Sequence, residues 1–113
     1  MNEQVQAYLE KYPAEIVGAF RRIRGLIYES CAVAPTENLW AKLPSYTVGD
    51  SFVRLIPFKD HINIEARAAI RHREELTGYR FTPKGMLQVY LNQCIPAEML
   101  KQVFTETLME GDA

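Results

Sequence analysis

Alternating apolar and polar positions fill the middle of the chain and predict a run of strands between residues 40 and 91. Gly49-Asp50 and Lys59-Asp60 are suited to two-residue turns, although Lys-Asp is a weaker turn signal than Asn-Gly. With both turns in place, residues 46–65 fold into consecutive hairpins, and residues 86–91 add a half-buried strand. The alternation therefore predicts an antiparallel sheet.

This register also separates the two faces of the predicted sheet. Phe58 faces His61 across the second turn, and Arg54 faces Glu65 as a pair of opposite charges. Because side chains alternate along a strand, one face holds the aliphatic residues and would meet the helices. The other face is expected to be open, with a mixture of aromatic and titratable side chains: Phe52, Arg54, Ile56, Phe58, His61, Asn63 and Glu65.

Apolar residues spaced three and four apart predict helices at both ends of the chain, around the sheet. Asn2 is placed to cap a first short helix. Pro13 suits the first turn of a second helix, which runs to about Cys31. A final helix is expected from about Pro96, with Gly111 as a left-handed C-cap.

Two charged segments have plain structural interpretations. Arg21, Arg22 and Arg24 lie opposite the apolar stripe of the second helix, so we expect them to form a solvated face. Residues 66–76 combine helix formers with several arginines. They are expected to form a short exposed helix in which His72 is solvated.

Length and charge limit the class of protein. The 113 residues are enough for one compact domain, so residues 1–113 are interpreted as a single domain. A net charge of -1 gives no general attraction to nucleic acid, and no nucleic-acid partner is expected. The chain has no signal-peptide pattern and no apolar run near the ~20 residues of a membrane span, which favours a cytoplasmic protein without a membrane partner. Cys31 and Cys94 lack metal-ligand spacing and are expected to be reduced and buried.

The open face offers the best candidate metal ligands. Iron ions favour carboxylate oxygen and imidazole nitrogen, and a delivery site should be weak and partly exposed. His61 and Glu65 share this face, with Asp60 at the adjoining turn, and these three residues are the candidate iron ligands. Arg54 would compete for Glu65, and His61 has a structural alternative, in which it stacks on Phe58 or caps the turn.

Enzymatic motifs are weak in this sequence. No nucleophile elbow and no recognisable Cys-His arrangement occurs, so the domain is interpreted as non-enzymatic. Thr82-Pro83-Lys84-Gly85 contains one glycine and one lysine, which falls short of a phosphate loop. The glycine is expected to supply an unusual φ before a strand, and Lys84 is a candidate contact for an anion.

A second functional hypothesis needs no metal. Aromatic side chains beside arginines could line a pocket for a small anion, or a flat protein interface. If Phe52, Ile56 and Phe58 point outward, they form an apolar patch that a homodimer or a covering segment from residues 79–81 would hide. The residues assigned to this ligand or partner face are Arg54, Phe58, Asn63, Lys84 and Tyr90.

Three short motifs occur in order along the chain: Leu43-Pro44-Ser45-Tyr46, Phe58-Lys59-Asp60-His61-Ile62, and Gly78-Tyr79 followed by Lys84-Gly85-Met86-Leu87-Gln88. In this order and spacing they resemble the YdhG-like family of unknown-function domains. The likeness runs over nearly the whole chain and implies an α+β fold with a frataxin-like layout. In that layout, N- and C-terminal helices pack on one side of an antiparallel sheet of about four or more strands. Lys42 departs from the family pattern, because many relatives have glycine before the [LM]-P pair.

The resemblance also carries a functional expectation. One branch of the family is described as a frataxin-like iron chaperone that hands iron to iron–sulfur and haem synthesis. It implies iron binding or delivery, with iron–sulfur or haem assembly proteins as partners. The alternative is a metal-free module that binds a small ligand or a protein through the open face of the sheet.

Overall fold

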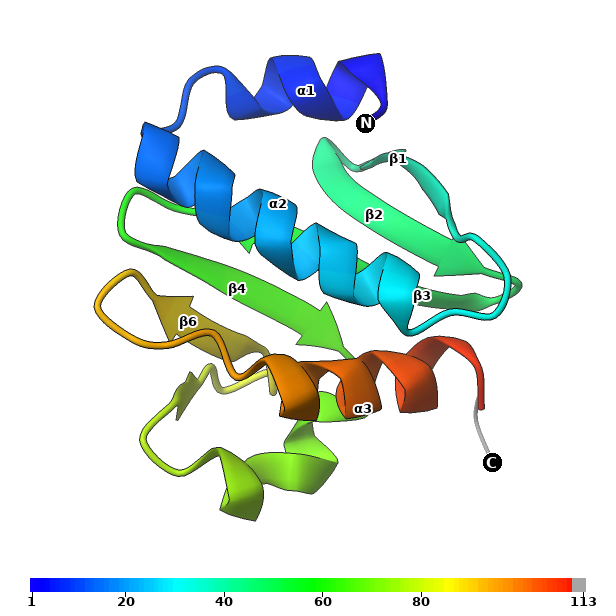
Figure 1. The fold of residues 1–113 in the computed structure, drawn as a ribbon, viewed down its shortest axis with the longest axis vertical. Helices are drawn as coiled ribbons and strands as arrows, with labels where there is room; N and C mark the ends of the chain where they lie inside the picture. The colour runs from blue at the N-terminus through cyan, green and yellow to red at the C-terminus, as the bar shows by residue number, and fades with distance from the viewer. Residues whose placement is uncertain (111–113) are drawn as a thin grey trace.

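The computed structural model describes residues 1–110 and has an α+β fold with one six-stranded antiparallel sheet (Figure 1). This fold class is the one that the sequence predicts. The strands, in the spatial order β1-β2-β3-β4-β6-β5, are β1 (Thr36–Trp40), β2 (Leu43–Val48), β3 (Ser51–Pro57), β4 (His61–Ala66), β6 (Leu87–Tyr90) and β5 (Arg80–Phe81). The helices are α1 (Glu3–Leu9), α2 (Ala14–Glu29), the 3-10 helix η1 (Ala69–Leu76) and α3 (Ala97–Leu108). Gly111, the expected C-cap, lies outside the described residues.

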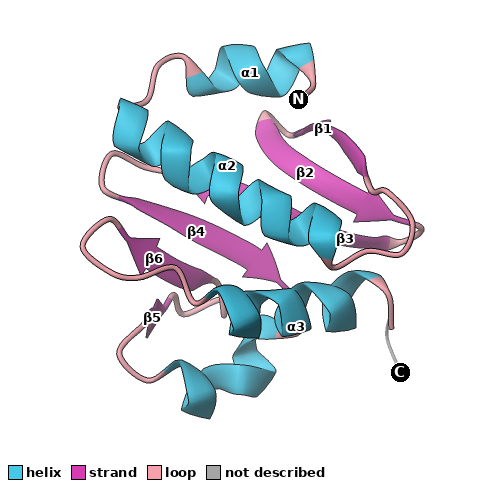
Figure 2. Cartoon of the chain, viewed as in Figure 1, coloured by secondary structure: helices cyan, strands magenta, loops and turns pink. Residues whose placement is uncertain are grey.

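Helices α2 and α3 lie side by side on one face of the sheet, with α1 beyond them near β1 (Figure 2). The Asn2 side chain caps α1 as predicted, because its Oδ1 accepts hydrogen bonds from the backbone N–H groups of Gln4 and Val5. Pro13 is the N-cap residue of α2 and precedes its first turn. The core between helices and sheet is built from fully buried apolar residues that include Ile16, Phe20, Ile23, Ile27, Leu55, Ile64, Leu100 and Phe104.

The predicted hairpin register is confirmed. Val48 pairs with Ser51 across the Gly49-Asp50 turn, and Gly49 has φ +59°. Across the next turn, the backbone N–H of Phe58 donates to the carbonyl of His61 at 2.8 Å. The open face of the sheet is therefore the one expected, and neither α2 nor α3 covers it (Figure 1).

Two edge strands were not expected from the sequence. Strand β1 begins at Thr36, before the run of strands predicted from residue 40, and pairs with β2. Strand β5 contains only two residues, and Phe81 pairs with Leu87 of β6. Short edge strands show little alternation in the sequence, and their formation depends on the neighbouring strand with which they pair.

The charged segment after β4 also differs from its prediction. It forms η1, in which the backbone at His72 leaves helical values (φ −106°, ψ 21°) and bends the helix. Ala69, His72 and Leu76 are buried, and His72 is only 9% exposed. The prediction of a solvated histidine is wrong, because η1 packs on α3 and encloses the imidazole.

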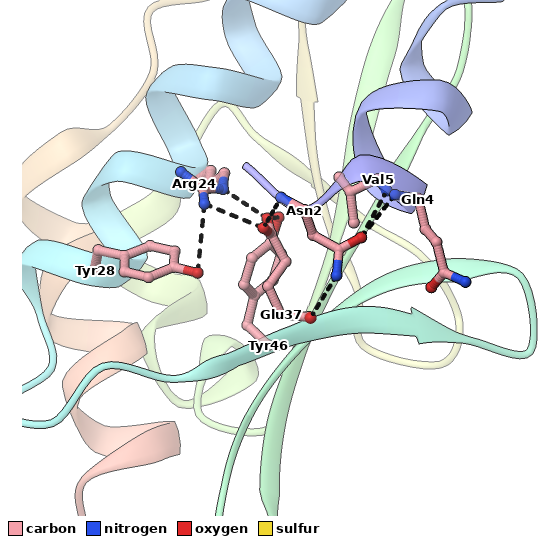
Figure 3. Close-up of polar contacts among 7 residues, drawn as sticks. All are labelled: Asn2, Gln4, Val5, Arg24, Tyr28, Glu37 and Tyr46. Atoms are coloured by element: carbon pink, nitrogen blue, oxygen red, sulfur yellow. Dashed lines mark hydrogen bonds and ion pairs between the residues drawn. The ribbon is translucent and has the colours of Figure 1, made fainter.

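Arg24 does not belong to the solvated face predicted for the second helix. Its Nε donates to Glu37 Oε2 at 2.6 Å, and its Nη2 donates to Oε1 at 3.1 Å (Figure 3). The Tyr46 hydroxyl and the backbone N–H of Asn2 also donate to this carboxylate, each at 2.7 Å. The two preceding arginines are exposed as predicted. Glu37 thus joins the start of α1, α2, β1 and β2 through one side chain that is 7% exposed.

The turn between β1 and β2 places two ordinary residues in the left-handed region. Ala41 has φ 48° and Lys42 has φ 67°, while Trp40 and Leu43 pair directly across the turn. A two-residue hairpin turn with positive φ at both central positions is the type that favours Asn-Gly. Side chains there are strained, so a glycine at position 42 would suit the backbone better.

We expect the double variant Ala41→Asn/Lys42→Gly to raise the free energy of unfolding by about 1 kcal/mol, since relief of strain outweighs the added freedom of glycine in the unfolded chain. Urea denaturation followed by circular dichroism measures this difference. Lys59→Gly is the matched control, because Lys59 occupies a turn without positive φ and should gain nothing. A double variant no more stable than the parent would contradict the strain argument.

The cysteines are unpaired, with Cys31 half-buried and Cys94 exposed. The expected burial of Cys94 is therefore wrong, because it lies in the surface connection before α3. Within residues 1–110, no helix has the length and apolar character needed to cross a membrane.

Candidate functional site

One half of the open face is a stack of rings from three strands or turns. The His61 imidazole lies between the rings of Phe58 and Tyr90, with centroids 4.5 Å away on each side. Arg80 of β5 extends the stack, with its guanidinium carbon 5.6 Å from the Tyr90 ring centroid. His61 Nδ1 also lies 2.7 Å from Asp60 Oδ1. His61 is thus stacked on Phe58, which is the structural alternative that the sequence analysis gave beside a metal role.

The other half of the open face is organised around Arg54. Its guanidinium carbon lies 3.8 Å from the ring centroids of Trp40 and Phe52, and its Nη1 donates to Glu65 Oε1 at 3.0 Å. The predicted cross-strand ion pair is confirmed. The Arg54 side chain is 11% exposed, and its buried Nε has no hydrogen-bond partner within residues 1–110. Two rings and one carboxylate therefore fix the position of this cation.

Between these two groups the open face is polar. Asn63, 8% exposed, accepts a hydrogen bond from Gln88 Nε2 at 3.1 Å. Tyr79 and Phe81 pack against the core, and β5 extends the sheet at its edge. These two rings therefore do not cover the open face, and only Arg80 of this segment contacts it, at Tyr90. Phe52, Ile56 and Phe58 are each half-buried.

The three candidate iron ligands are only partly brought together. Asp60 and His61 are in direct contact, but Glu65 lies four residues along β4, about 13 Å from His61 at the usual rise of a strand. Glu65 is also engaged by Arg54. Within residues 1–110, no three His, Cys, Asp or Glu side chains gather into a group that could hold a metal ion. Iron binding stays a prediction.

A cavity of about 670 Å³ lies at the end of the sheet where β3 and β6 begin and β4 and β5 end. We call it the end cleft. Residues of η1, the turn before β3 and the loop between β5 and β6 complete its walls. Its apolar lining includes Phe52, Ile70, Phe81 and Met86, and its charged lining is Asp50, Glu65, Arg67, Arg73 and Lys84.

The loop between β5 and β6 contributes a side chain rather than a backbone cradle. Gly85 has φ +90°, as expected for this glycine, and its N–H donates to the Thr82 carbonyl at 2.9 Å. The Met86 N–H donates to the Thr82 hydroxyl at 3.1 Å. Since these N–H groups are already used, an anion here would be met by the Lys84 side chain, which lines the end cleft.

Arg73 faces the same cavity from η1. Neither Arg73 nor Lys84 has a hydrogen bond or an ion pair within residues 1–110, and both are exposed. Arg67 differs, since its Nη2 donates to the carbonyl of Thr107 at 3.1 Å. Two exposed cations without partners and a nearby apolar lining are suited to an organic anion.

His72 anchors the η1 wall of the end cleft to α3. Its Nε2 lies 3.0 Å from both carboxylate oxygens of Glu106, and its Nδ1 lies 3.0 Å from Glu75 Oε2. The hydrogen bonds to Glu106, then to Glu75, raise the pKa of His72 above 6.5, although partial burial opposes them. The charged imidazole is thereby favoured, and η1 is held in place by it.

The sequence reasoning identified only part of this site. Of the predicted ligand or partner face, Lys84 lines the end cleft, Arg54 touches it through Phe52 and Glu65, and the remaining residues, Phe58, Asn63 and Tyr90, lie elsewhere on the sheet. Arg73 and Ile70 were missed as site residues. The sequence could have indicated them only through topology. If the strand at residues 86–91 pairs antiparallel with β4, the loop before that strand lies beside the segment that follows β4.

Comparison with known proteins yields no relative. No family model, no curated protein and no solved structure matches this chain. The likeness to YdhG-like domains stays a prediction from the motifs.

Proposed function

We propose that this chain is a non-enzymatic domain that binds a small organic anion with an apolar body in the end cleft. The observation that supports this most is one cavity of about 670 Å³ that combines apolar side chains with two cations lacking partners within residues 1–110. Ligand pockets commonly have volumes of about 300 to 1,000 Å³, mostly apolar walls and a few placed polar groups. The end cleft fits that description.

Electrostatics favours an anion over a neutral ligand. The cleft lining has three cationic residues and two acidic ones, and the acidic Glu65 is already paired with Arg54. A ligand would therefore meet Arg73 and Lys84 first. Arginine can bind a carboxylate or phosphate with two parallel hydrogen bonds, and lysine adds a mobile point charge.

Binding in the end cleft agrees with the metal-free hypothesis, but the site lies at the end of the sheet instead of on its open face. Phe52 and Glu65 lie on the open face and also line the cleft, so the two regions share part of their surface. The ring stack around His61 is engaged internally, and a homodimer through that part of the face stays a prediction.

A titration with hexanoate tests the proposal. We expect cross-peaks of cleft residues in a ¹H–¹⁵N correlation spectrum to shift saturably, and the double variant Arg73→Gln/Lys84→Gln to weaken binding at least about tenfold, since it removes both charge-assisted contacts. The control Arg22→Gln/Lys59→Gln makes the same change of charge at exposed positions on α2 and at the opposite end of the sheet. Absence of saturable shifts, or equal weakening by the control, would reject the end cleft as an anion site.

The iron hypothesis is tested in the same preparation with anaerobic ferrous iron. Saturable binding that is lost in His61→Ala/Glu65→Ala, and kept in Arg73→Gln/Lys84→Gln, would favour iron handling on the open face over the anion proposal. The contact between Asp60 and His61 at the exposed hairpin is the feature of the structure on which such a site would have to be built.

A further inference from the structure

Apart from Arg67, which follows β4 and donates to the carbonyl of Thr107, the charged residues of the end cleft are divided between its two ends. Asp50 lies in the turn before β3 and Glu65 lies on β4, whereas Lys84 lies in the loop between β5 and β6. Since the strand order is β3-β4-β6-β5, Glu65 on β4 lies one to two strand spacings, about 5 to 10 Å, from the loop between β5 and β6.

Arg73 belongs to the basic end. A side chain added at Gly85 would lie 4.0 Å from the Cβ of Ile70, so the beginning of η1 is close to the loop between β5 and β6. Arg73 follows Ile70 across the bend at His72, and both residues line the cleft. Arg73 and Lys84, which have no partner within residues 1–110, thus both belong to the side of the cleft formed by η1 and the loop between β5 and β6.

Glu65 is a fixed acceptor at the acidic end. Its Oε1 is held by Arg54, which is itself fixed between two aromatic rings. Its Oε2 has no hydrogen bond or ion pair within residues 1–110, and the side chain is 32% exposed. A carboxylate that is held at one oxygen and open at the other is placed to accept a hydrogen bond from a ligand.

We propose that the ligand of the end cleft is bipolar, with an ammonium or similar cationic N–H donor at Glu65 and a carboxylate or other anion at Arg73 and Lys84. This inference rests on the proposed function and narrows its ligand class to zwitterions about 5 to 10 Å long. The apolar lining between the two ends accepts the connecting carbon chain. A simple anion makes no use of the open Oε2 of Glu65, whereas a zwitterion is bound at both ends.

Three probes with the same carbon chain separate these cases: 6-aminohexanoate, hexanoate and hexylamine. Their flexible chain adapts to the spacing of the two ends. We expect 6-aminohexanoate to bind about tenfold more tightly than hexanoate, because a charge-assisted hydrogen bond is added, and hexylamine to bind most weakly. The dissociation constants come from titrations followed by ¹H–¹⁵N correlation spectra of the whole chain.

The variant Glu65→Gln carries the decisive comparison. It keeps an oxygen acceptor for Arg54 and removes the negative charge, so we expect the preference for 6-aminohexanoate over hexanoate to disappear while hexanoate binding is kept or strengthened. Glu74→Gln is the matched control, since Glu74 is exposed on η1 and does not line the cleft. Its spectrum and its ligand preference should equal those of the parent.

The outcomes distinguish the two proposals. If hexanoate binds as tightly as 6-aminohexanoate, or if Glu65→Gln retains the preference, the bipolar ligand is refuted and the anion site stands. If no probe binds saturably, or if Arg73→Gln/Lys84→Gln leaves the binding of all three unchanged, the proposed function itself is refuted. A preference that is lost in Glu65→Gln alone supports the inference.

Discussion

Replacing Glu37 with glutamine is expected to lower the free energy of unfolding by about 3 kcal/mol, because breaking one partner of a buried ion pair leaves the other charge uncompensated. The glutamine amide would present a donor where Glu37 now accepts from Arg24, Tyr46 and Asn2. Urea denaturation at pH 7 measures the loss. A smaller step, Tyr46→Phe, removes a single donor and should cost about 1 kcal/mol.

Glu10→Gln is the control for Glu37→Gln, since Glu10 is an exposed carboxylate at the end of α1. It should change stability by less than about 0.5 kcal/mol, as is usual for surface positions. If Glu37→Gln costs no more than Glu10→Gln, the four-element junction at Glu37 does not stabilise the fold.

The Glu37 carboxylate also makes the free energy of unfolding depend on pH in the acidic range. Burial raises the pKa of Glu37, but hydrogen bonds from Arg24, Asn2 and Tyr46 outweigh it, and the net pKa lies below 4.5. A carboxyl whose pKa is lowered on folding contributes stability above its unfolded pKa, and this contribution is lost as the pH falls through the folded pKa. The difference between the parent and Glu37→Gln should therefore shrink below pH 4.5.

The second large effect is expected at His72, and it has the opposite dependence on pH. Replacing His72 with glutamine should cost about 2 kcal/mol near pH 5.5, because the charged imidazole makes charge-assisted hydrogen bonds to Glu106 and Glu75. Arg71 Nη1, 3.7 Å from Glu106, and Gln102 also face this cluster and soften the loss.

The direction of this pH dependence follows from the pKa of His72, which is raised first by the hydrogen bond to Glu106 and then by the one to Glu75. Its stabilisation is complete below the unfolded pKa of 6.5 and is lost as the pH rises through the folded pKa. Denaturation curves of the parent and of His72→Gln should therefore converge at alkaline pH. His61→Gln, at the only other histidine, is the control, and a difference between parent and His72→Gln that stays constant with pH would show that packing rather than charge holds η1.

Much of the sheet could be predicted from local pattern. The alternation of side chains around Gly49-Asp50 and Lys59-Asp60 determines which residues face each other, and a shift by one residue would turn the aliphatic set outward. The pairs Phe58 with His61 and Arg54 with Glu65 follow from that constraint alone. They were predicted correctly because neighbours in a hairpin are also close in sequence.

Polar residues were predicted less well wherever their partners lie far along the chain. Arg24 and His72 looked like surface charges because the carboxylates that help to bury them lie on other elements. Arg24 meets Glu37 of β1, and His72 meets Glu106, which is 34 residues away on α3. A charge pattern alone cannot distinguish a solvated residue from one whose partner arrives with another element.

The end cleft also depends on contacts between distant parts of the chain. By itself, the sequence determined the α+β fold class, the register of the two hairpins between residues 46 and 65 and the open face of those strands, since turn residues and period-two alternation act over a few neighbouring residues. Only the tertiary structure decided that the turn at Asp50, the end of β4, η1 and the loop at Lys84 meet around one cavity. The physical reason is that β4 pairs with β6, which closes a distance of more than twenty residues and joins charges that no local pattern relates.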